Sequence, residues 1–188
     1  AGPGRSIKHM MNTKNAWTID NVHSEIQFRA RHMVVSTVTG KFDSFQSTVE
    51  TEGDSLEGAV VSFTADVASV NTCNEQRDNH LRSDDFFNSE KYPQLTFRSD
   101  SFKKTSGENY ELKGQLTIRD VTKAITLEVE YGGTIKDPYG NQRSGFTATG
   151  KVSRKEFGLK WNALLERGGA VGSDEVKVDC HVEYVLPV

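Results

Sequence analysis

The feature that most constrains the fold of this 188-residue chain is a regular alternation of apolar and polar side chains. In the longest example, from Val176 to Leu186, every second residue is apolar. This period of two is typical of a β-strand with one buried and one exposed face. The pattern occupies residues 26–31, 61–67, 112–118, 125–131, 146–152 and 176–186. We expect shorter strands at residues 17–20, 41–51 and 95–102.

Turn-forming residues separate several of the predicted strands. Glu52–Ser55, Ser106–Asn109 and Asp137–Asn141 each contain a glycine beside Asp, Ser or Asn, a composition that suits tight reversals. The consecutive glycines Gly132 and Gly133 predict a bulge or a bend within a long strand. These signals favour antiparallel strands over parallel ones.

One segment, from Asn71 to Tyr92, lacks the alternation and is rich in helix-forming residues. It predicts a short polar helix near Asn74–Arg82, followed by a second helical turn that Ser83 caps. Pro93 is expected to end this segment. No long helices alternate with the predicted strands, which excludes a parallel α/β sheet.

Eight or more antiparallel strands with one apolar face must bury that face, either against a second sheet or inside a barrel. Gly114 and Gly150 fall on the inward-facing phase and are expected to leave space, which favours a barrel with a cavity. The alternation itself is equally compatible with a packed core and with a cavity wall. The modest apolar content of 35% suits strands that are wet on one face.

Composition and charge exclude several classes of protein. The formal net charge of -3 provides no basic surface of the kind that nucleic-acid binding requires. No apolar run of about 18 residues is present, so no membrane span is expected. Residues 1–10 are predicted to be an expression-tag remnant, with a single domain over residues 11–188. Without a visible export signal the expected location is the cytoplasm, and the alternative is a periplasmic mature form.

The histidines and cysteines of the chain show no catalytic or metal-binding pattern. His23, His32, His80 and His181 show no spacing that suits a metal, and no serine lies in a nucleophile motif. We therefore expect no metal, no catalytic residues and no cofactor other than a bound ligand. His23 is predicted to hydrogen-bond to Asp20, and His181 to face solvent. Cys73 and Cys180 form no metal-binding or redox motif, and Cys180 is predicted to be a buried apolar residue.

Four motifs occur in order between Trp17 and Pro187. They are Trp17-x-Ile-Asp20-x-x-His23-Ser24-x-Ile-x-Phe28, Arg77-Asp-x-His80-Leu-Arg-Ser-x-Asp85-Phe-Phe, Gly114-x-Leu-Thr-Ile-Arg-x-Val-Thr-Lys123 and Phe157-Gly-Leu-x-Trp161-Asn162. Together they resemble the YceI-like family. The resemblance implies an all-β fold, an extended antiparallel lipocalin-like β-barrel of about eight strands, with a short helical segment near residues 74–90.

The resemblance also implies a function. Members of this family hold a polyisoprenoid or a similar long-chain amphiphile, and some form homodimers. We therefore expect non-enzymatic binding, storage or transport of such a lipid. The alternatives are an enzyme that acts on an isoprenoid lipid and an interaction module whose interior is packed.

The residues of the predicted lipid site fall into two groups. The cavity wall is expected to contain Ile26, Phe28, Val61, Phe63, Leu116, Ile118, Ile125, Leu127, Phe146, Val178 and Val182. Arg77 and His80 are candidates for contact with an anionic or oxygen-bearing headgroup, because a guanidinium suits phosphate. Solvent exposure of the same helix is the simpler alternative for these two residues.

Overall fold

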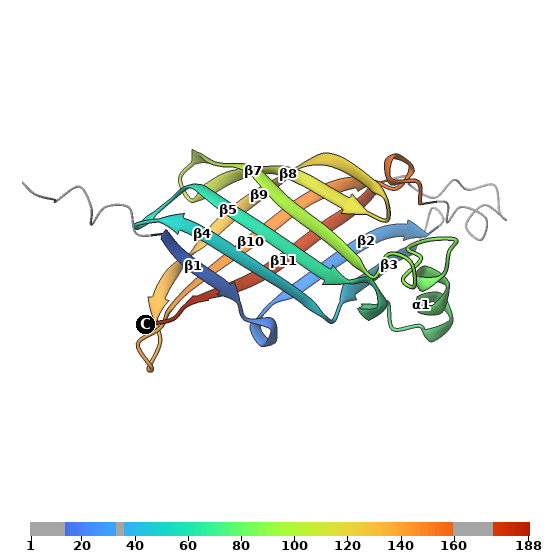
Figure 1. The fold of residues 1–188 in the computed structure, drawn as a ribbon, viewed down its shortest axis with the longest axis horizontal. Helices are drawn as coiled ribbons and strands as arrows, with labels where there is room; N and C mark the ends of the chain where they lie inside the picture. The colour runs from blue at the N-terminus through green and yellow to red at the C-terminus, as the bar shows by residue number, and fades with distance from the viewer. Residues whose placement is uncertain (1–13, 33–35, 160–174) are drawn as a thin grey trace, which may run out of the picture.

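The computed structural model describes residues 14–32, 36–159 and 175–188. Antiparallel strands form an elongated barrel, and one short helix, α1 (Glu75–Arg82), lies at one end of it (Figure 1). The strands are β1 (Lys14–Ile19), β2 (Glu25–His32), β3 (Ser36–Phe42), β4 (Phe45–Glu52), β5 (Ser55–Asp66), β6 (Val70–Asn71), β7 (Gln94–Ser106), β8 (Asn109–Ile118), β9 (Val121–Lys136), β10 (Gln142–Ser153) and β11 (Glu175–Leu186).

Three of the barrel strands are interrupted part-way along their length. The 3₁₀ turn η1 (Asn21–His23) separates β1 from β2, and η2 (Val67–Ser69) separates β5 from β6. A bend at Asp43–Ser44 separates β3 from β4. If each interrupted pair is taken as one strand, the described chain forms an eight-stranded barrel in which neighbours in sequence pair antiparallel.

The barrel is closed by β11. One side of β11 pairs with β10 over its whole length. Its other side pairs first with β2, from Val176 to His181, and then with β1, where Tyr184 and Val185 lie opposite Ile19 and Thr18. The all-β barrel that the sequence predicts is therefore confirmed, because its last strand pairs with its first.

The expected strand at 41–51 is wrong in one respect, because it is broken at Asp43–Ser44. There the backbone bonds to η2 in place of a regular ladder: Asp43 N–H donates to the carbonyl of Ser69 at 3.1 Å, and Ser44 N–H donates to Ser69 Oγ at 3.0 Å. Asp66 N–H in turn donates to the carbonyl of Ser44 at 2.9 Å. Hydrogen bonds between the two breaks thus hold the strands together where both bend.

The predicted helix is confirmed as α1, with Asn74 at its N-terminus accepting a hydrogen bond from Arg77 N–H at 3.0 Å. The second helical turn is wrong. Ser83 Oγ donates instead to the carbonyl of His80 and closes the C-terminus of α1, and residues 84–87 form turns. Gln94 begins β7 directly after Pro93, where the segment was expected to end.

Glycines on the inward phase do not leave space, contrary to expectation. A Cβ at Gly114 would lie 2.5 Å from Cζ of Phe97, whose ring already covers that position. Leu127 covers Gly150 in the same way.

The predicted bulge at Gly132–Gly133 is confirmed by the pairing of β9 with β10, which shifts register between Gly145 and Phe146. The three predicted turns join β4 to β5, β7 to β8 and β9 to β10.

Close packing at Gly114 generates the first prediction. Gly114→Ala should lower the free energy of unfolding by about 1–3 kcal/mol, since the new methyl overlaps both the Phe97 ring and the backbone oxygen of Arg98. Gly145→Ala is the matched control, because a Cβ there meets nothing within 4 Å. Urea denaturation of both variants measures the difference. Equal stability of the two variants would contradict the packing argument.

Candidate functional site

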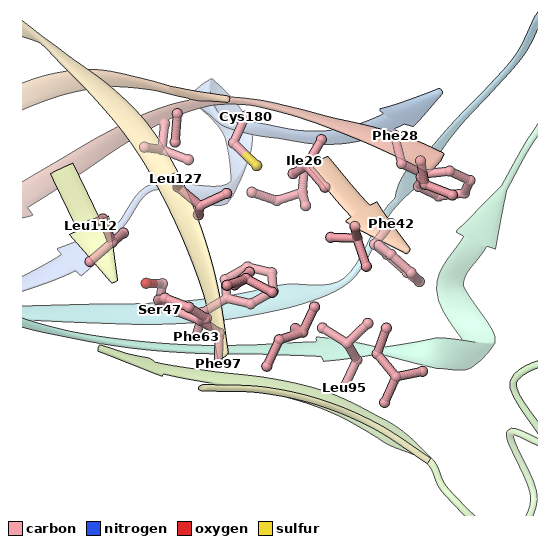
Figure 2. A pocket seen from close by; sticks show the side chains of 18 of the residues that line it. Ile26, Phe28, Phe42, Ser47, Phe63, Leu95, Phe97, Leu112, Leu127 and Cys180 are labelled. Carbon is pink, nitrogen blue, oxygen red and sulfur yellow. The ribbon is translucent and has the colours of Figure 1, made fainter. Parts of the chain in front are cut away.

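The barrel encloses an elongated cavity with an almost wholly apolar wall. Its volume is about 230 Å³. Figure 2 shows side chains from opposite strands converging on this space, among them Ile26, Phe63, Leu112 and Leu127. Because each strand directs every second side chain inward, residues far apart in the sequence form one continuous wall.

Every wall residue that the sequence predicts lines this cavity. They are Ile26, Phe28, Val61, Phe63, Leu116, Ile118, Ile125, Leu127, Phe146, Val178 and Val182. Whether these side chains contact a lipid stays a prediction. The packed-core alternative is not favoured, because the side chains surround a space instead of filling it.

Sequence reasoning missed two aromatic residues that line the cavity near α1. Phe86 and Phe87 follow α1 and line the cavity, and their rings meet edge to face with centroids 4.6 Å apart. Phe87 also lies against Phe42 of β3 at 6.0 Å. Arg119 holds this segment by donating to the carbonyls of Asp84 at 3.1 Å and Phe86 at 3.2 Å. Two adjacent phenylalanines in a polar segment were the available signal.

Two of the polar wall groups bond to each other. Ser47 Oγ donates to the carbonyl of Ser62 at 2.8 Å, which leaves Tyr184 Oη to donate to Ser47 Oγ at 2.7 Å. Burial raises the pKa of Tyr184 to about 12 and the pKa of the Cys180 thiol to about 12. Both side chains are therefore neutral at pH 7, and the cavity gains no ionised nucleophile from them.

The headgroup candidates lie beside the cavity, and neither is among the described residues that line it. Arg77 Nε donates to Thr72 Oγ1 at 2.8 Å, and Nη2 donates to the carbonyl of Thr72 at 2.9 Å. The buried carboxylate of Asp78 accepts from Thr72 N–H at 2.9 Å and from its hydroxyl at 2.6 Å. His80 Nε2 lies 3.3 Å from Asp85. Contact of Arg77 and His80 with a headgroup stays a prediction.

Arg154 is a wall residue that sequence reasoning also missed. It lines the cavity directly after β10, and only 3% of its surface is exposed. The available signal was its phase, because it continues the inward series of Phe146, Ala148, Gly150 and Val152 by one more alternate position.

A charged cluster lies on η1 and the neighbouring strands. His23 Nδ1 donates to Asp20 at 2.8 Å, which confirms the predicted hydrogen bond. Arg143 Nη1 lies 2.9 Å from Asp20 and 3.4 Å from Glu183, and its Nε lies 2.9 Å from Asp137. Asp20, His23 and Glu183 together offer three possible metal ligands, but the guanidinium already supplies the positive charge beside the two carboxylates.

Hydrogen bonds control the ionisation of this cluster. The bonds from His23 and Arg143 lower the pKa of Asp20 to about 2. Burial opposes the ionisation of Asp137, but hydrogen bonds from Arg143 and from the N–H groups of Asn141 and Tyr139 lower its pKa. Because these pKa values are depressed, the contribution of both carboxylates to stability is lost as the pH falls.

The structure also shows where the remaining histidines and cysteines of the sequence analysis lie. His181 is exposed on β11, as predicted. Cys180 lies among the residues that line the cavity, and Cys73 is exposed. Several predictions lie outside the described residues: the side chain of His32, the motif residues Trp161 and Asn162, and the tag at 1–10.

Among the described helices, none has the length and apolar character needed to cross a membrane.

The closed up-and-down barrel with an apolar interior defines a lipocalin-like protein. The model of the YceI-like domain matches residues 17–184, and the chain belongs to this family. A UPF0312 protein of Staphylococcus aureus (strain USA300) is 36% identical over 173 residues, which cover 90% of this chain and 97% of the relative.

Three solved structures share the barrel. A YCEI protein of Campylobacter jejuni has a TM-score of 0.74 and 33% identity, covering 84% of this chain and 90% of that protein. Burkholderia cenocepacia BcnA has a TM-score of 0.75 and 22% identity, covering 88% and 98%. A polyisoprenoid-binding domain from Saccharophagus degradans has a TM-score of 0.68 and 20% identity, covering 92% and 99%. The last two, at their low identity, show likeness of fold alone.

The charged cluster predicts a pH dependence of stability. The contribution of Asp20 should be complete above its usual pKa of 3.8 and be lost as the pH falls toward about 2. Asp20→Asn should therefore lower the free energy of unfolding on the order of 1–2 kcal/mol at pH 7 and flatten its decline below pH 4. Urea denaturation between pH 2 and 7 tests this. Asp54→Asn, in the exposed β4–β5 turn, is the control, and an identical profile for both variants would refute the assignment.

The contacts of Arg77 generate a separate prediction. Arg77→Ala removes two hydrogen bonds to Thr72, so the free energy of unfolding should fall by about 1–3 kcal/mol. Thermal or urea denaturation measures this. The headgroup hypothesis makes the opposite prediction for Arg77→Ala and for His80→Ala: unchanged stability with weaker lipid binding.

Proposed function

We propose that the protein binds a polyisoprenoid or a similar long-chain amphiphilic lipid inside the barrel and stores or transports it without altering it. The observation that carries this proposal is the apolar cavity enclosed by the strands. Each square ångström of apolar surface that leaves water stabilises the complex by roughly 25 cal/mol. A long chain therefore gains affinity from its length and needs few polar contacts.

The shape of the cavity suits a chain. Its wall extends from Phe28 and Phe42, near α1, to Leu112, toward the other end of the barrel, where Phe102 lies opposite Leu112. The domain from Saccharophagus degradans that shares this fold binds a polyisoprenoid, and we extend that class of ligand to this barrel as part of the proposal. The branched methyl groups of an isoprenoid chain match a wall built of Val, Ile, Leu and Phe, whose side chains are themselves branched or flat.

The chemistry of the wall favours binding over catalysis. An enzyme that acts on the lipid would need a general base or a nucleophile in the cavity. The raised pKa values of Tyr184 and Cys180 keep both groups protonated at neutral pH, and Tyr184 is already bonded to Ser47. The alternative function, an enzyme that acts on the lipid, can be distinguished by experiment, because it predicts a chemically altered lipid.

The proposal is tested by extracting purified protein with organic solvent and analysing the extract by mass spectrometry. A long-chain lipid should be recovered, and added octaprenyl lipids should bind and be recovered unchanged. Recovery of a chemically altered lipid would support the enzyme. Failure to recover or take up any long-chain lipid would overturn the proposal and favour the interaction module.

Substitution of the wall makes the same hypothesis quantitative. Ala148 points into the cavity, and its neighbour Thr149 on β10 is exposed. Ala148→Phe should weaken octaprenol binding by about tenfold, the loss expected if the ring displaces contacts worth roughly two buried methylenes. Thr149→Phe adds the same group outside the barrel and should leave the affinity unchanged. Titration followed by tryptophan fluorescence or native mass spectrometry measures both, and equal effects would contradict a ligand inside the barrel.

A further inference from the structure

The position of Arg154 is set by the backbone that surrounds it. It follows β10 and precedes η3 (Lys155–Phe157), and its carbonyl accepts hydrogen bonds from Phe157 N–H at 3.2 Å and Leu159 N–H at 3.1 Å. Leu159 itself lines the cavity. The chain therefore turns at the end of β10, where the Arg154 side chain lines the cavity and is shielded from solvent.

Arg154 differs in kind from the rest of the wall. Among the described residues that line the cavity, it alone carries a permanent charge. Val152 and Val176, which lie opposite each other at the ends of β10 and β11, line the same region and are apolar. A cation in such a medium interacts strongly with a nearby anion, because little water is present to screen the pair.

A guanidinium offers the geometry that an anionic headgroup requires. Its five N–H donors lie in one plane, and two of them can bind two oxygens of a phosphate or a carboxylate at once. With so many donors, the group can keep contacts within the protein and still donate to a ligand. A lysine in the same place would present only a point charge.

We propose that Arg154 binds the anionic head of the lipid, so that the cavity selects long-chain lipids that end in a phosphate or carboxylate. This inference rests on the proposed lipid-binding function and names its ligand class. It also sets the direction of the ligand. The head lies where β10 ends, at the same end of the barrel as α1, and the tail extends toward Phe102 and Leu112.

The test compares octaprenyl phosphate with octaprenol, two probes with the same chain and different heads. The wild-type protein should bind octaprenyl phosphate at least about tenfold more tightly, as one or two charge-assisted hydrogen bonds imply. Arg154→Gln should weaken octaprenyl phosphate binding by about tenfold to a hundredfold and should weaken octaprenol binding much less. Arg98→Gln, on the exposed face of β7, is the matched control and should change neither affinity.

Each outcome bears on one hypothesis. Equal wild-type affinity for the two probes overturns the role of Arg154, and so does an equal loss for both probes in Arg154→Gln, which indicates a structural role. If neither probe binds the wild-type protein, the proposed function itself fails. Should Arg154→Gln not fold, the wild-type preference and Arg154→Lys decide: the lysine variant should keep octaprenol binding and lose part of the preference for phosphate.

Discussion

The pairing of β11 with both β1 and β2 is the interaction on which the rest of the structure depends. It joins the last strand to the first and turns an open sheet into a closed cylinder. A closed ladder lets neighbouring strands satisfy most of one another's backbone hydrogen bonds within the wall. The wall is thus held by its own hydrogen bonds, and the interior does not have to be filled for the fold to exist.

The size of the cavity depends on how the inward-facing side chains pack against one another. The rings of Phe28 and Phe97 cover Gly40 and Gly114, and Leu127 covers Gly150, so large inward residues lie over small ones. The residues after α1 add Phe86 and Phe87 at one end. What remains is an apolar space lined by side chains from strands around the barrel.

Arginine side chains form hydrogen bonds to segments that lie outside the strand pairing of the barrel. Arg143 joins the N-terminus of η1 to the β9–β10 turn, Arg119 binds the carbonyls after α1, and Arg77 binds Thr72 between β6 and α1. Arg143 bridges acceptors from different elements, whereas Arg119 and Arg77 each place two or more donors on one segment. Arg154 belongs to the same residue type but faces the cavity, which is why its proposed partner is a ligand.

Much of this protein was determined by the sequence alone. The alternation at 26–31, 112–118 and 176–186 defines the strands and their inward face, because a period of two is a local property of the chain. All of the predicted wall residues consequently line the cavity. The turns and the glycine bulge followed from residue types with known backbone preferences.

Only the tertiary structure decided what the inward face encloses. Whether Gly114 leaves a gap depends on the Phe97 ring of the neighbouring strand, and whether Arg77 reaches the cavity depends on Thr72. Both are contacts between elements, which no local pattern encodes. The inward phase of Arg154 was visible in the sequence, but the apolar surroundings that give its charge a role exist only once the strands close into a barrel.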